Sequence, residues 1–167
     1  IADAPSPPAR HAEVLTALLH RRRVGSFEMT ESPLNGALEL PAPFASSPYT
    51  THIVPLEEGG DAVESRFSRG NLGNIRRGRR LGVASRIAAS LDDYREYHRI
   101  YEKSLERWGG RTTSRYPWAL FEAGHEIGMR FPDNMRLWLA EADNSVAAGA
   151  WVFYWNRHVV YWHGATD

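Results

Sequence analysis

The stretch "MRLWLAEADNSVAAGAWVFYWNRHVVYWHGATD" (135–167) decides the fold class. It is rich in aromatic and β-branched residues, which are enriched in strands. Asp143-Asn144 and Asn156-Arg157 divide it at positions suited to tight hairpin turns, where Asn and Asp are favoured. The pattern therefore predicts three consecutive antiparallel strands, with a hairpin over 135–155 and a third strand after the second turn.

Two helices are predicted before these strands. Ser90 and Asp93 have the spacing of a capping box, which opens a helix, and Gly109-Gly110 ends that helix after Trp108. Its inward face carries residues at alternating steps of three and four: Leu91, Tyr94, His98, Tyr101, Leu105 and Trp108. The second helix is expected over 117–131, with four side chains inward: Trp118, Phe121, His125 and Met129.

A short strand, "GVASRIA" (82–88), is predicted ahead of the first of these helices. The order strand, helix, helix and antiparallel meander indicates the α+β class. Both helices should pack on one face of the sheet. Trp138 and Trp151 should be at least partly covered, because burying each ring is worth several kcal/mol at about 25 cal/mol per Å².

The first part of the chain has a different character. A helix is predicted from Pro8, with an apolar stripe of Val14, Leu15, Leu18 and Leu19. Residues 25–50 are rich in proline and read as a connector. "THIVPL" (51–56) is predicted to be a short strand.

Between these parts lies "NLGNIRRGRRLGV" (71–83), with four arginines in five positions around Gly78. No acidic residue occurs from Ser65 to Leu91, although the net charge of the chain is zero. Each glycine weakens a helix by about 1 kcal/mol relative to alanine, so residues 61–81 are expected to form a short or broken helix. The local charge suggests that this segment binds an anion, since guanidinium groups match phosphate oxygens. The alternative is a solvated basic face that pairs with the acidic residues Glu57, Glu58, Asp61 and Glu64.

Length and composition bound the function further. A chain of 167 residues is one ordinary domain or pieces of two, and zero cysteines exclude disulfides and thiolate chemistry. The seven histidines show no metal-ligand spacing, so no metal site is expected. No apolar run approaches the roughly 18 residues of a membrane span, so no stable membrane insertion and a cytoplasmic location are expected.

The chain resembles the FemAB-like branch of the Gcn5-related N-acetyltransferase (GNAT) superfamily. The resemblance rests on "THIVPL", "GNIRRGRRLGV", "LDDYREYHRIYEKSLERWGG" and "RLWLAEADNSVAAGAWVFYWNRHVVYWHGATD", which lie within 51–167. It implies a partial GNAT-like fold, in which the basic segment usually forms an uninterrupted helix. It also implies that residues 1–57 are the tail of a preceding half with its Pro-rich connector, and that 58–167 are the first portion of a second, truncated domain.

The resemblance further implies transfer of an acyl or aminoacyl group onto an amine of a cell-envelope or polysaccharide precursor. The donor is expected to be acyl-CoA or aminoacyl-tRNA, and the acceptor a small or a lipid- or nucleotide-linked molecule. Asn74, Arg76 and Arg77 are expected beside the acceptor's pyrophosphate. The sheet edges of a truncated domain are expected to promote self-association.

The remaining candidate residues lie in the loop between the helices and on the last strand. Arg115 and Tyr116 border the expected acceptor site, and an ordinary polar loop is the alternative. His163, with Asp167, is a candidate base, although transferases of this fold often need little beyond positioning and a main-chain amide. Trp162 is a candidate ligand wall, and a place in the core of the sheet is the alternative for it. A second class of function stays open: a non-catalytic anion, nucleic-acid or protein interaction module that uses the basic patch Arg66–Arg86.

Overall fold

The computed structural model describes residues 8–25, 27, 28, 30, 44–109 and 115–167. These residues fall into two compact units, 1–63 and 64–167. The second unit holds a sheet and two helices that pack on it. Helix α2 (Gly60–Ser65) lies at the division between the units.

The first unit begins with the predicted helix, α1 (Pro8–Arg22). It ends in a left-handed residue, Arg23 (φ 53°), with the amides of Arg23 and Val24 bonded to the carbonyls of His20 and Leu19. The predicted strand over 51–56 is wrong: this segment is irregular and exposed. Pro55 cannot donate to a ladder, and no neighbouring strand is described beside the segment.

The second unit contains one antiparallel sheet in the order β1-β2-β3-β4. Its strands are β1 (Ala84–Ile87), β2 (Met135–Ala142), β3 (Ser145–Trp155) and β4 (His158–Thr166). Both residues of each predicted turn have positive φ, between 45° and 64°, as type I′ hairpins require. The predicted meander and the α+β class are confirmed.

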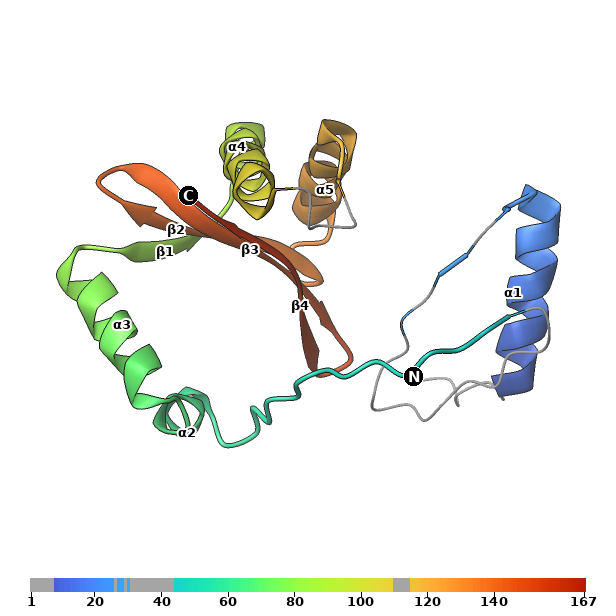
Figure 1. Cartoon of the computed structure of the whole chain (residues 1–167), viewed down its shortest axis with the longest axis horizontal. Helices are drawn as coiled ribbons and strands as arrows, with labels where there is room; N and C mark the ends of the chain where they lie inside the picture. The colour runs from blue at the N-terminus through green and yellow to red at the C-terminus, as the bar shows by residue number, and fades with distance from the viewer. Residues whose placement is uncertain (1–7, 26, 29, 31–43, 110–114) are drawn as a thin grey trace. The chain divides into compact units, whose positions relative to one another are not determined.

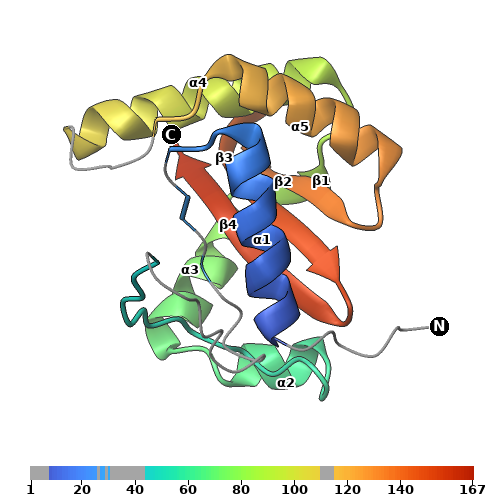
Figure 2. The same cartoon turned by 90° about the vertical axis from the view of Figure 1, so that its right-hand side faces the viewer.

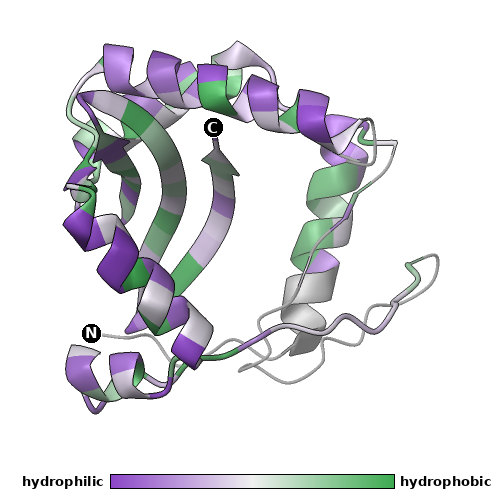
Figure 3. Cartoon of the chain, turned by 60° about the vertical axis from the view of Figure 1, so that its left-hand side comes forward, coloured by the Kyte–Doolittle hydropathy of each residue, from purple (hydrophilic) through white to green (hydrophobic). Residues whose placement is uncertain are grey.

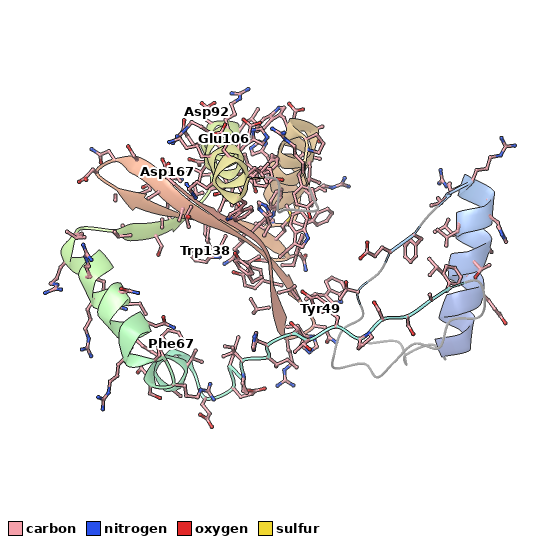
Figure 4. The ribbon with its side chains drawn as sticks, in the orientation of Figure 1. Tyr49, Phe67, Asp92, Glu106, Trp138 and Asp167 are labelled. Atoms are coloured by element: carbon pink, nitrogen blue, oxygen red, sulfur yellow. The ribbon has the colours of Figure 1, made fainter. Side chains whose placement is uncertain are left out.

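Two helices cover one face of this sheet, α4 (Leu91–Trp108) and α5 (Trp118–Arg130). Figures 1 and 2 show them side by side above the strands, and both contact the sheet. The core between the layers is strongly aromatic, and its fully buried members include Tyr97, Tyr101, Phe121, Leu137 and Trp151. Trp138 is half-buried on the sheet face turned away from the helices (Figure 4).

The inward faces of the helices differ in part from those predicted. In α4 the buried residues include Tyr97, Ile100 and Ser104, whereas the predicted Trp108 is exposed. In α5, Met129 is 57% exposed. Gly124 faces inward instead. It packs so closely on the sheet that a Cβ there would lie 2.0 Å from the Trp151 ring. The pattern of apolar residues does not predict this inward position, because glycine has no side chain that would mark it as apolar in the sequence.

The start of α4 is tied to the sheet by charge. The predicted capping box of Ser90 and Asp93 is present. Arg86 of β1 bonds both to Asp93, at 2.6 Å, and to Glu141 of β2, at 2.8 Å. The Arg86 guanidinium holds the pKa of Asp93 at about 2, well below its usual 3.8, so this carboxylate stays ionised.

The basic segment forms α3 (Arg69–Arg80), an uninterrupted helix. The expected interruption at Gly73 and Gly78 is wrong, because strong end signals hold the helix. The Ser68 hydroxyl accepts from the Asn71 amide at the start. At the end, Gly82 adopts φ 74°, and the amides of Gly82 and Val83 bond to the carbonyls of Arg79 and Gly78, which is a Schellman motif. Among the residues that the structure describes, no helix is long and apolar enough to cross a membrane.

Candidate functional site

The most distinctive feature of β4 is a bulge at Trp162. Tyr161 pairs with Val152 and His163 with Trp151, so one residue of β4 has no partner in the register. An extra residue brings neighbouring side chains to the same side of the sheet. Trp162 and His163 accordingly both contact Tyr116 and lie against the layer formed by α4 and α5.

His163 is half-buried and sits within a ring of aromatic side chains. Its Nδ1 atom lies 2.6 Å from the Tyr97 hydroxyl, and its ring packs at 4.9 Å from that of Tyr101. Burial lowers the pKa of His163 below 6.5, so the ring is neutral at neutral pH. Burial also raises the pKa of Tyr97, which keeps its hydroxyl protonated. In the tautomer whose Nδ1–H donates to the Tyr97 oxygen, the other ring nitrogen, Nε2, is unprotonated and can accept a proton.

Tyr116 and Trp162 form an aromatic wall beside this histidine. Their ring centroids lie 5.5 Å apart, and Tyr116 also stacks on Tyr101 at 6.1 Å. The Tyr116 amide donates to the Tyr101 hydroxyl at 2.8 Å, which fixes the end of the loop between the helices against α4. Trp162 is 38% exposed and Tyr116 half-buried, so a face of the wall reaches solvent. The structure therefore brings together three of the predicted site residues, Tyr116, Trp162 and His163. Arg115, which is exposed, directly precedes Tyr116 in the chain.

Asp167 lies at the end of β4, where Lys103 of α4 holds it. The ammonium lies 2.8 Å from one carboxylate oxygen and 2.9 Å from the other, and Arg99 lies at 3.7 Å. The hydrogen bonds from Lys103 lower the pKa of this carboxyl group. The polar partner of His163 is Tyr97 and that of Asp167 is Lys103, so the two predicted catalytic residues are bonded to different groups.

Asn74, Arg76 and Arg77 are exposed on α3. In a continuous helix Asn74 and Arg76 are two positions apart and point about 160° away from each other. The structure therefore does not place these three residues on one face. Arg86, at the end of the predicted basic patch, is engaged by Asp93 and Glu141 and belongs to the packing of the sheet.

Several functional candidates were missed from the sequence. Tyr97 was overlooked, although its spacing from Tyr94 and Tyr101 continues an aromatic face of α4. Ser104 and Arg107 both bond to the main chain of Thr166 and cover the outer edge of β4 there. No local signal pairs these residues with a strand about 60 positions away.

The opposite face of the sheet is hollowed. A pocket of about 340 Å³ is floored by small residues of β2, β3 and β4, including Ala140, Ala148, Ala150 and Gly164, and is flanked by Trp138 and Tyr161. A Cβ on Gly164 would lie 1.8 Å from the Tyr161 hydroxyl, so this exposed tyrosine covers the glycine and would have to move to admit a larger residue. No cluster of three or more potential metal ligands occurs among the described residues.

Gly164 also lies on the outer edge of β4. The Asp167 amide bonds to Ala147 of β3, and by alternation the main-chain groups of Gly164 point away from β3. No hydrogen bond to Gly164 from outside the sheet occurs within the described ranges. An amide donor on a strand edge, beside a half-buried neutral histidine, is an arrangement that suits acyl transfer.

A family model described as the acetyltransferase (GNAT) domain matches residues 66–167, which hold the sheet, both packed helices and the aromatic wall. The chain belongs to this family. GNAT domains are acyltransferases, and this match confirms the superfamily level of the resemblance seen in the sequence. No curated protein matches the chain.

GNAT acetyltransferases typically use acyl-CoA. The outward amide of Gly164 is available to a thioester carbonyl, and the small-residue floor beside it leaves room for an aliphatic arm.

Proposed function

We propose that this GNAT domain transfers an acyl group from acyl-CoA to an amine, at the outer edge of β4 beside the aromatic wall. The observation that carries the proposal is the juxtaposition of Tyr116, Trp162 and His163 by the bulge in β4. The wall is the partly exposed surface next to the neutral base, and it suits an acceptor. Acyl-CoA supplies the activated thioester.

The reaction needs an amine nitrogen to attack the thioester carbonyl. The C–N bond forms as the C–S bond breaks, the nitrogen loses a proton, and the thiolate leaving group gains one. An amide aimed at the carbonyl oxygen stabilises the negative charge that develops there. The outward amide of Gly164 takes this role in the proposal.

His163 accepts the proton from the attacking amine. Its lowered pKa keeps it unprotonated at neutral pH, and the Tyr97 hydroxyl fixes its ring. Asp167 takes no direct part in the proton transfer. Its bonds to Lys103 anchor the end of β4 to α4. Asp167 is therefore a positioning residue in this scheme.

The acceptor in this proposal is an amine on a cell-envelope or polysaccharide precursor, as in the FemAB-like branch, and the reaction takes place in the cytoplasm. What supports a sugar-like acceptor is the aromatic wall, because flat rings bury the apolar face of a bulky polar ligand while leaving its polar edges solvated. Arg115, exposed next to Tyr116, is placed to meet an anionic group on it. Aminoacyl-tRNA is the alternative donor.

The proposal is tested by thiol release from acetyl-CoA with a nucleotide-linked amino sugar as acceptor. Tyr116→Ala and Trp162→Ala should each raise the acceptor KM about tenfold, equivalent to about 1.4 kcal/mol, with the donor KM nearly unchanged. Trp155→Ala, which removes a tryptophan that is 74% exposed at the far end of β3, is the matched control and should change neither constant. Equal effects of all three substitutions would remove the wall from the acceptor site.

A further inference from the structure

The continuous helix α3 gathers four arginines around one glycine. Arg69, Arg76, Arg77 and Arg80 lie four residues before, and three, four and seven residues after, Gly73. Positions at these spacings share one face of a helix. We call these four arginines and Gly73 the arginine face of α3; in Figure 3 the helix is drawn largely in purple, the colour of hydrophilic residues.

The arginine face is exposed to solvent, and its positive charge has no acidic partner among the described residues. All five residues are exposed, and a Cβ on Gly73 would meet nothing within 4 Å. Within the described ranges none of the four arginines pairs with an acid, whereas Arg79, on the adjacent side of the helix, lies 3.7 Å from Glu64. The bare main chain at Gly73 therefore lets a bulky anion approach between the guanidinium groups.

The shape of this surface selects the kind of anion. Arg69 and Arg80 are separated by about 16 Å along the helix, at 1.5 Å per residue. Sites for small molecules are concave, but the face is convex, and no α3 residue lines the pocket on the sheet. A compact pyrophosphate has no cradle here, whereas an extended polyanion can follow the row of guanidinium groups.

The apolar side of α3 argues against a membrane surface. Its two aliphatic residues, Leu72 and Ile75, are both partly covered. A helix that binds at a membrane interface instead exposes a wide apolar face. Guanidinium groups match phosphate oxygens in paired hydrogen bonds, which favours a chain of phosphodiesters.

We propose that the arginine face of α3 binds the phosphate backbone of a nucleic acid, without reading its bases. This is a second function, separate from acyl transfer at β4. It replaces the predicted set of Asn74, Arg76 and Arg77 with one in which Asn74 has no part, and it takes up the nucleic-acid alternative left open by the sequence.

The test is fluorescence anisotropy of a labelled single-stranded oligonucleotide of about 20 residues, titrated with the chain at several salt concentrations. Each phosphate contact contributes about −0.7 to the slope of log K against log[salt] for a single strand, so four contacts predict a slope of about −2.8. Arg76→Gln/Arg80→Gln should make the slope shallower by about 1.4. Arg95→Gln/Arg130→Gln removes the same charge from exposed positions on α4 and α5 and should leave the slope unchanged.

A second variant separates shape from charge. Gly73→Leu keeps every charge and fills open space, so it should weaken binding several-fold while the helix signal in circular dichroism is retained. Equal salt slopes for the two double variants would overturn the proposal. So would displacement of the oligonucleotide by inorganic pyrophosphate at an equal phosphate concentration, or preferential binding to vesicles of anionic phospholipid.

Discussion

His163 is the residue on which the proposed proton transfer depends. Its pKa is lowered by burial, so the midpoint of its titration, followed by NMR, should lie below the usual 6.5. The unfolded chain takes up this proton at higher pH than the folded one, so His163 makes the protein less stable as pH falls below about 6.5. Tyr97→Phe should leave the midpoint low, because burial and not the hydroxyl is the cause. A midpoint at or above 6.5 in the native protein would contradict this environment.

At Gly124 the helix α5 packs closely on the sheet. Gly124→Ala should destabilise the fold by about 1–3 kcal/mol, because the new methyl group collides with the buried Trp151 ring. Gly73→Ala is the matched control, a helical glycine with open space around it, and should stabilise its helix by up to about 1 kcal/mol. Thermal unfolding of both variants measures the difference, and equal melting temperatures would argue against the close contact.

At the scale of elements, Asp93 links the start of α4 to β1. Its pKa is about 2 in the folded protein and 3.8 as a model value, so its ionisation contributes about 2 kcal/mol of stability. That contribution is complete above about pH 4 and is lost as pH falls towards 2. Asp93→Asn should lower stability at neutral pH and flatten this acid dependence.

Asp92→Asn is the control for this prediction. Asp92 is 83% exposed and its only described partner, Arg95, is also on the surface, so its loss should change stability by less than about 1 kcal/mol. Chemical denaturation between pH 2 and 7 distinguishes the two variants. Similar pH profiles for both would show that the Arg86 bridge does not stabilise the fold.

The elements that the sequence predicted best have residues typical of helix caps or turns at their ends and a regular spacing of apolar residues. Ser90, Asp93 and Gly109 marked α4, and the two turns with positive φ marked the meander. A broken helix was predicted for α3 because its glycines weaken a helix. The caps at Ser68 and Gly82, which stabilise the helix, were not part of that prediction. The segment 51–56 has strand composition, but a strand also needs a neighbour, which composition does not supply.

At the scale of the molecule, β4 is the outer strand of the sheet that the structure describes. Ser104 covers its edge at Thr166, while Val159, Val160 and Tyr161 are each about half-exposed or more. Unpaired strand edges of this kind invite pairing with another chain. We expect concentration-dependent self-association in sedimentation velocity, and Val160→Lys should weaken it. A stable monomer at high protein concentration would contradict this expectation.

The candidate site was only partly accessible from sequence for a physical reason. His163, Trp162 and Tyr116 were predictable as aromatic or titratable groups near the end of a strand and in a loop. Their convergence depends on the bulge in β4 and on the Tyr97 hydroxyl, and both are products of register and packing. Sequence spacing alone does not specify either one.

Acyl transfer at β4 is tested by NMR titration of the chain with acetyl-CoA. If the donor binds there, the largest shifts should occur at the main-chain amide of Gly164 and the indole N–H of Trp162. Subsequent addition of an amine acceptor should then shift Tyr116 and His163. Shifts that are largest on α1 or on the outward face of α5, with Gly164 and Trp162 unaffected, would contradict it.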